Sequence, residues 1–143
     1  MTPLKLVPLS ETVSVAGQIS PADLPGIARA GFKSVICNRP DGESPGQFDH
    51  RELALASSQA GLTLAYQPVV SGRVSPDDGQ AFAALLSQLP APTLAYCRSG
   101  MRSAALWALS QADRQPWPTL VQKAAQAGYN LSGVTPPAQT SHS

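Results

Sequence analysis

Short apolar runs alternate with capped helical segments along most of this 143-residue chain. Serine or aspartate caps precede three of the helical segments, and Ser20-Pro21 and Ser75-Pro76 are two of these caps. Because strands that alternate with helices form parallel sheets with helical crossovers, the pattern predicts an α/β fold. We expect a single domain whose central, mostly parallel sheet is flanked by helices.

The boundaries of the expected elements follow from the caps and from the glycines and prolines that end the apolar runs. Residues 1–135 are expected to form the domain, and residues 136–143 are expected to be a disordered tail. The expected strands are 13–17, 32–37, 62–66 and 93–96, and the expected helices are 20–30, 49–60, 75–88, 103–112 and 119–127.

The segment 96–103, Tyr-Cys-Arg-Ser-Gly-Met-Arg-Ser, joins the last expected strand to an alanine-rich helix. Backbone N–H groups of such a loop and the start of the following helix both attract negative charge. Cys97 lies in this field beside Arg98 and Arg102, so its thiolate is expected to be favoured at neutral pH. Ser103 is expected to donate a hydrogen bond toward the sulfur or to cap the helix. The predicted catalytic residues are Cys97 and Arg102, and the predicted anion-binding loop adds Arg98, Ser99, Gly100, Met101 and Ser103.

A buried cysteine that only packs is the simpler interpretation of Cys97. However, packing does not explain two arginines near a buried strand end, because unpaired buried charge is costly. In parallel sheets, ligands bind at the carboxyl ends of the strands. The loops that follow Cys37 and Tyr66 should therefore share an edge with Cys97. This edge supplies the accessory candidates Arg39, Asp41, Ser71 and Cys37.

The composition excludes several classes of function. Charged residues make up 13% of the chain and the net charge is +1, so nucleic-acid binding has no support. No apolar run is long enough to span a membrane. The two histidines, His50 and His142, lie far apart in the sequence, so neither a metal nor an organic cofactor is expected. Two cysteines without a secretory signal favour a cytoplasmic location.

Four segments of the chain together resemble one family. They are residues 35–43, which include the run Asn-Arg-Pro-Asp-Gly-Glu, and residues 67–69, 75–76 and 97–103. The pattern resembles the phosphatase-like domains of the beta-lactamase-hydrolase-like proteins, which implies a fold like that of dual-specificity phosphatases. The resemblance also implies Cys97 as the nucleophile and Arg102 as the anion-binding arginine. Members of this family are described both as phosphatase-like and as sulfurtransferases, and some are fused to a persulfide-oxidising metallo-hydrolase, which is thus the expected protein partner.

The spacing of the cysteine loop separates two reactions. Four residues lie between Cys97 and Arg102, as in rhodanese-type sulfurtransferases, whereas tyrosine phosphatases have five. Dual-specificity phosphatases also carry a general-acid aspartate near the position of Ser71, and such acids contribute about 10²–10⁴ in rate. The sequence therefore favours a sulfurtransferase that takes sulfur from a small anionic donor through a Cys97 persulfide. A phosphatase that acts through phosphocysteine and a non-catalytic anion-binding or redox-sensing module stay open.

Cys37 and Asp41 each have two interpretations. Some phosphatase relatives trap an oxidised nucleophile with a second cysteine, so the resemblance implies a reversible Cys37–Cys97 disulfide or sulfur transfer to Cys37. The simpler interpretation of Cys37 is a buried strand cysteine. Asp41 either serves a turn or supplies the acid that the loop near Ser71 lacks.

Overall fold

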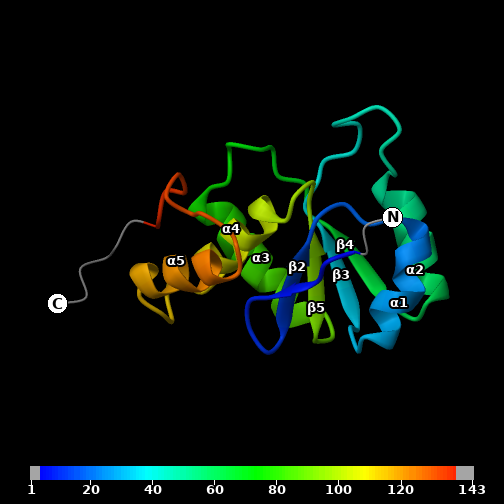
Figure 1. The fold of residues 1–143 in the computed structure, drawn as a ribbon, viewed down its shortest axis with the longest axis horizontal. Helices are drawn as coiled ribbons and strands as arrows, with labels where there is room; N and C mark the ends of the chain where they lie inside the picture. Colours follow the sequence, from blue (N-terminus) through cyan, green and yellow to red (C-terminus); the bar gives the residue numbers. More distant parts are fainter. Residues whose placement is uncertain (1–3, 138–143) are drawn as a thin grey trace.

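The computed structural model describes residues 4–137 and contains a five-stranded mixed sheet between two layers of helices (Figure 1). The strand order is β1-β2-β5-β3-β4. The last four strands in that order run parallel, and β1 pairs with β2 in the antiparallel direction. The strands are β1 (Val7–Pro8), β2 (Val13–Ala16), β3 (Ser34–Cys37), β4 (Thr63–Tyr66) and β5 (Thr93–Tyr96).

The sequence predicted the α/β class, the mostly parallel sheet and four of its five strands. It missed β1, because two residues are too few to show an alternating pattern. A short 3₁₀ turn, η1 (Pro21–Asp23), precedes the first helix where the sequence predicted one continuous helix. The helices are α1 (Leu24–Arg29), α2 (His50–Gln59), α3 (Pro76–Gln88), α4 (Met101–Ser110) and α5 (Trp117–Gln126).

Alternating residues of the strands send apolar side chains into two separate clusters, one on each face of the sheet. Ile36 and Ala95 pack with Trp107 on the face covered by α3, α4 and α5. Val35 and Leu94 lie in the cluster on the opposite face, which α1 and α2 cover (Figure 1). Because both faces are buried, the three inner strands are fixed in register.

Helix α4 is buried along nearly its whole length, from Arg102 to Ser110. It lies between α3 and α5, and its alanines allow a close approach. The closest approach is at Gly79 of α3, where a Cβ atom would lie 2.3 Å from the Cβ of Leu109. The helix that follows the cysteine loop is therefore packed into the core from Arg102 onward.

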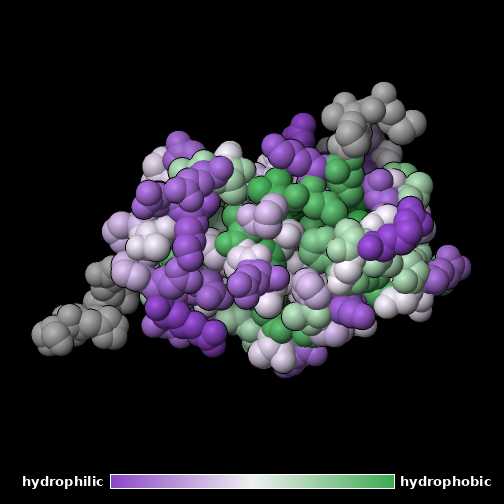
Figure 2. Space-filling model, turned by 60° about the horizontal axis from the view of Figure 1, so that its bottom comes forward, coloured by the Kyte–Doolittle hydropathy of each residue, from purple (hydrophilic) through white to green (hydrophobic). Residues whose placement is uncertain are grey.

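Polar residues cover the end of the molecule that carries α5, whereas apolar residues gather near the middle of the face in Figure 2. The inner side of α5 packs Leu120 and Ala124 into the core. Among the described residues, no helix is both long enough and apolar enough to cross a membrane. Most of the predicted tail, residues 138–143, lies outside the described residues.

Three loops leave the carboxyl edge of the sheet together. Cys37 is in register with Tyr66 on one side and with Tyr96 on the other, so β3, β4 and β5 end at one level. The loops 38–49, 67–75 and 97–100 start there and meet above the sheet (Figure 1). This edge is where ligands bind in open α/β sheets.

Candidate active site

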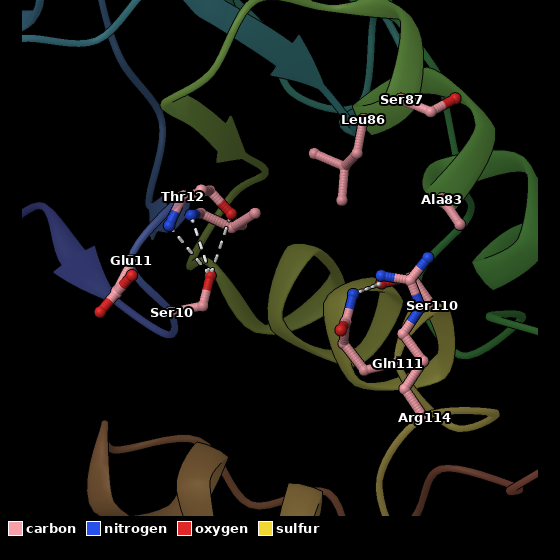
Figure 3. Close-up of a pocket in the computed structure, with 10 residues that line it drawn as sticks. Ser10, Glu11, Thr12, Ala83, Leu86, Ser87, Ser110, Gln111 and Arg114 are labelled. Atoms are coloured by element: carbon pink, nitrogen blue, oxygen red, sulfur yellow. Dashed lines mark hydrogen bonds between the residues drawn. The ribbon is translucent and has the colours of Figure 1, made fainter.

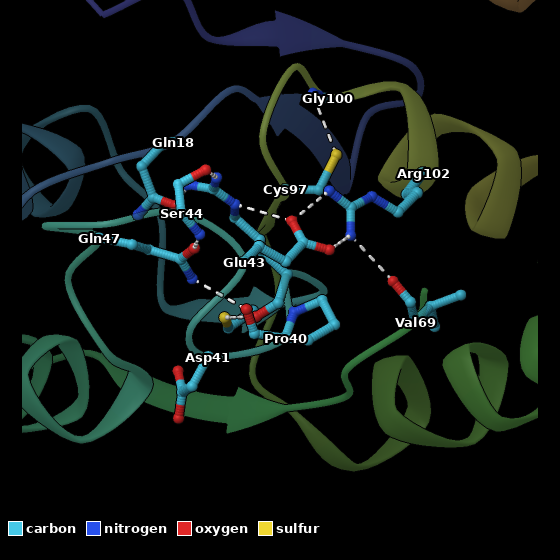
Figure 4. A network of polar contacts seen from close by, with 12 residues as sticks. Gln18, Pro40, Asp41, Glu43, Ser44, Gln47, Val69, Cys97, Gly100 and Arg102 are labelled. Carbon is cyan, nitrogen blue, oxygen red and sulfur yellow. Dashed lines mark hydrogen bonds and ion pairs between the residues drawn. The ribbon is translucent and has the colours of Figure 1, made fainter. Parts of the chain in front are cut away.

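Cys97 follows the last residue of β5 and is only 1% exposed. Its backbone N–H donates to the Ala16 carbonyl at 3.3 Å, which continues the pairing with β2. The N–H of Gly100 donates to the Cys97 Sγ at 3.1 Å (Figure 4). This N–H belongs to the residue that caps α4, so the sulfur lies at the positive end of a buried helix. Such surroundings favour a negatively charged group bound at this loop.

Gly100 holds the loop in a conformation that other residues avoid, with a φ of +95°. A Cβ atom at this position would lie 2.3 Å from the hydroxyl oxygen of Tyr129, which packs directly on the turn. That hydroxyl donates to the Ser99 carbonyl at 3.4 Å. Burial, and secondarily the nearby charge of Cys97, raises the pKa of Tyr129. Sequence reasoning missed Tyr129, because a single aromatic residue in a turn has no periodic signal.

Arg102 is 7% exposed and is held by a bidentate ion pair with Glu43. Its Nη1 donates to Glu43 Oε2 at 2.6 Å and its Nη2 donates to Glu43 Oε1 at 2.9 Å. Nη1 also donates to the Val69 carbonyl at 2.9 Å. The hydrogen bonds from Arg102 hold the pKa of Glu43 below its usual range. The bonds to Glu43 and Val69 leave the Nε–H and one proton of Nη2, and Arg102 interacts on this side with the Cys97 sulfur, so this edge can bind an oxyanion next to the sulfur.

Arg39 has a supporting position rather than a place in the anion site. Its guanidinium donates to Glu43, Gln18 and Ser44, each at 2.9 Å, and the residue is 5% exposed. Glu43 therefore lies between two buried arginines, Arg39 and Arg102, and Figure 4 shows its carboxylate beside Arg102. Sequence reasoning did not select Glu43. The available signal was the need of two buried arginines for an anionic partner.

Ser103 neither contacts the sulfur nor caps α4, which corrects both expectations for this residue. The helix begins two residues earlier, at Met101, and its cap is Gly100. The Ser103 hydroxyl instead donates to Asn38 Oδ1 at 2.8 Å, and Asn38 Nδ2 donates to the Gln67 carbonyl at 3.0 Å. These two bonds tie the loops 38–49 and 67–75 to the first turn of α4.

Asp41 is committed to a different contact. Its carboxylate accepts a hydrogen bond from the His50 backbone N–H at 2.8 Å and pairs with the His50 ring, which stacks on Tyr66. Figure 4 shows the Asp41 side chain pointing away from Cys97. This arrangement matches the expected role in a turn and gives Asp41 no contact with the site.

Cys37 pairs in register with Tyr96 and belongs to the apolar cluster under α1 and α2. Cys97 comes one residue after Tyr96, so it continues the alternation toward the other face. Burial raises the pKa of the Cys37 thiol, which keeps the thiol protonated and slow to react. The contacts describe a packed strand cysteine. Disulfide formation with Cys97 and sulfur transfer to Cys37 stay predictions.

A pocket of about 290 Å³ opens beside the cysteine loop. Ser71, Arg98, Ser99, Met101 and Arg102 line it, together with residues that follow α5. A second pocket, of about 470 Å³, lies at the opposite edge of the sheet near the β1–β2 turn (Figure 3). Neither a cysteine nor a histidine lines the second pocket, whereas Arg98, Ser99 and Arg102 of the cysteine loop and the start of α4 line the first. In the part of the chain from residue 4 to residue 137, no group of three His, Cys, Asp or Glu side chains could hold a metal ion.

Comparison with solved structures shows the same fold in phosphatases. One such structure is a Neisseria meningitidis protein that is named as a proposed phosphatase and is 36% identical to this chain. The two superpose with a TM-score of 0.80 over 88% of this chain and 90% of that one. Kinase associated phosphatase is 14% identical, with a TM-score of 0.71 over 88% of this chain and 83% of that one, which shows a shared fold. The fold is thus that of the tyrosine and dual-specificity phosphatases.

Comparison of the sequence identifies the family. The beta-lactamase hydrolase-like protein of Agrobacterium fabrum is 35% identical over 109 residues. That match covers 76% of this chain but 25% of the relative, so the chain spans about a quarter of the length of the curated relatives it matches. Residues 5–114 match the family profile described as "Beta-lactamase hydrolase-like protein, phosphatase-like domain". The chain belongs to this family of phosphatase-like domains.

Proposed function

We propose that this protein is a cysteine-dependent enzyme of the phosphatase type, in which Cys97 attacks a small anionic substrate. The observation that carries the proposal is the arrangement of the cysteine loop: a buried sulfur accepts the Gly100 N–H at the start of α4, and Arg102 offers one open edge beside it. Such an arrangement binds an anion and activates a thiolate in one place.

Phosphoester hydrolysis is the first candidate, and the phosphatase names of the structural relatives support it. The Cys97 thiolate would form an S–P bond while the P–O bond to the leaving group breaks. Water would then attack phosphorus, release phosphate and return the thiolate. The backbone N–H groups of the cysteine loop, such as that of Gly100, and the open edge of Arg102 would hold the phosphoryl oxygens throughout both steps.

The acids near the site restrict which leaving groups can depart. Glu43 is ionised by its arginine partners, and Asp41 is paired with His50 and turned away. Ser71 lines the pocket near the position where dual-specificity phosphatases carry their general-acid aspartate, and a hydroxyl is a poor proton donor there. We therefore propose that substrates carry leaving groups that depart without a proton, such as nitrophenolate.

Sulfur transfer is the second candidate, and two observations favour it. Only four residues separate Cys97 from Arg102, and none of the described acids is placed to protonate a leaving group. The Cys97 thiolate would attack the outer sulfur of thiosulfate, form a persulfide and release sulfite, which needs no proton. An acceptor such as cyanide would take that sulfur as thiocyanate and regenerate the thiolate.

Parallel assays of the purified chain separate the candidates. One reaction contains nitrophenyl phosphate and an alkyl phosphate, and the other contains thiosulfate and cyanide. Nitrophenyl phosphate turned over at least about 100-fold faster than the alkyl ester would support phosphatase chemistry without a general acid. Thiocyanate formation without phosphate release would support sulfur transfer. Cys97→Ser should remove whichever activity exists. A wild-type chain inactive in both assays would contradict the proposal and favour an anion-binding module.

A further inference from the structure

The pocket beside the cysteine loop contains a cation that the proposed chemistry does not use. Arg98 lines the pocket next to the nucleophile and is exposed. Arg98 makes no ion pair within residues 4–137, whereas Arg39 and Arg102 are both paired with Glu43. An arginine that is free at the wall of a pocket is available to a ligand.

The rest of the pocket wall is of mixed character. Val74, Met101 and Val134 are partly buried apolar residues that extend the core to the pocket. Asn130 adds a polar group: its Oδ1 accepts the Ser132 N–H at 2.9 Å, which leaves its amide protons for other partners. A volume of about 290 Å³ suits a small molecule rather than a folded partner.

Part of this wall comes from beyond the family match. The matched region ends at residue 114, whereas Asn130, Gly133 and Val134 belong to the segment after α5. Tyr129 begins this segment and packs on the Gly100 turn. The same segment therefore supports the cysteine loop and closes one side of the pocket, whose other side is formed by Arg98, Ser99 and Arg102.

We propose that this pocket binds the organic part of the substrate and that Arg98 selects a carboxylate on it. The substrate class is a small organic anion with two charged groups. The reacting group goes to Cys97 and Arg102, a short apolar part contacts Val74 and Val134, and the carboxylate accepts a bidentate bond from Arg98. The position of the reacting group rests on the proposed function. The class includes a carboxylated aryl phosphate and the persulfide of an amino-acid thiol.

Binding of an unreactive pair of ligands tests Arg98 apart from catalysis. Calorimetry compares 3-sulfobenzoate, which carries a sulfonate and a carboxylate, with benzenesulfonate, which lacks the carboxylate. The wild-type chain should bind the carboxylate form about tenfold more tightly, the effect of one strong charge-assisted contact. Arg98→Gln should remove this difference. Arg73→Gln, which removes an exposed charge from the neighbouring loop but not from the pocket wall, should retain it.

Turnover of nitrophenyl phosphate and of thiosulfate by the wild-type chain is measured separately. If the chain turns over either substrate but binds 3-sulfobenzoate no more tightly than benzenesulfonate, the assignment of Arg98 is overturned and the proposed function stands. The same conclusion follows if the binding preference is present but survives Arg98→Gln. An Arg98-dependent preference without turnover would support the pocket and reject the proposed function. If Arg98→Gln and Arg73→Gln lose the binding preference for 3-sulfobenzoate equally, the preference comes from general surface charge, and the assignment of Arg98 is also overturned.

Discussion

Arg102 combines two tasks in one planar group, because one edge is held by Glu43 while the other faces the cysteine loop. Arg102→Lys keeps the charge but provides only a single point of contact. We expect the turnover number to fall by about 10²–10³, as for loss of a preorganised donor, with the fold retained. Steady-state kinetics and circular dichroism measure the two effects. Arg73→Lys is the control for the same exchange at an exposed site, and near-normal turnover in Arg102→Lys would remove this arginine from the site.

Glu43 links the site to stability at low pH. Its pKa in the folded protein lies below its ordinary value of 4.5 because of the Arg102 hydrogen bonds, so the unfolded chain binds the proton more readily. The stabilisation by Glu43 is therefore complete above pH 4.5 and is lost as the pH falls through the lower, folded value.

Glu43→Gln should lower the free energy of unfolding by about 2 kcal/mol at neutral pH, because two buried arginines lose their charged partner. The difference from the wild-type chain should shrink as the pH falls below 4.5. Urea unfolding at several pH values measures it. Glu11→Gln, which changes an exposed carboxylate at the opposite edge of the sheet, should change stability by less than about 0.5 kcal/mol. A difference that is constant with pH would show that Glu43 does not titrate as described.

At the scale of elements, most of the fold could be predicted because each helix and strand carries its own local signal. The cap at Ser75-Pro76 and the short run of buried residues that forms β3 are examples. The start of α4 was placed two residues late, because Ser103 looks like a cap in the sequence but reaches across to Asn38. A local sequence pattern does not show whether a serine hydroxyl caps its own helix or bonds to a residue far away in the sequence.

The site could be predicted only in part for the same reason. Cys97 and Arg102 are separated by four residues and could be recognised as a unit. Glu43 reaches Arg102 across 59 positions, and Tyr129 reaches Ser99 across 30. These contacts depend on how the loops meet above the sheet, which composition and spacing do not specify.

The contact of α3 with α4 gives a prediction for packing. At Gly79, an added Cβ would overlap Leu109, so Gly79→Ala should destabilise the fold by about 1–3 kcal/mol. Gly26→Ala is the matched control in α1, where the added Cβ would meet only the flexible end of Arg29 at 3.8 Å. The control should be neutral or stabilising by up to about 1 kcal/mol. Urea unfolding compares the two, and equal effects would contradict the close contact.

At the scale of the whole molecule, the carboxyl edge of the sheet gathers everything that the proposed reaction needs. The edge brings together β5 with its cysteine, the loop with Glu43 and the start of α4. The segment after α5 completes the wall of the pocket from a part of the chain outside the family match. In the proposed function, the part of the chain that matches the family supplies the nucleophile and the anion site, and the later segment shapes the pocket beside them.

The central claim is that Cys97 carries the transferred group. Mass spectrometry tests it directly, after the chain is incubated briefly with nitrophenyl phosphate or thiosulfate, denatured at neutral pH, alkylated and cleaved into peptides. The account predicts that the peptide with Cys97 gains one phosphoryl group or one sulfur atom, and that Cys97→Ser gains neither. Turnover without any adduct on Cys97, or an adduct on Cys37 that persists in Cys97→Ser, would contradict the claim.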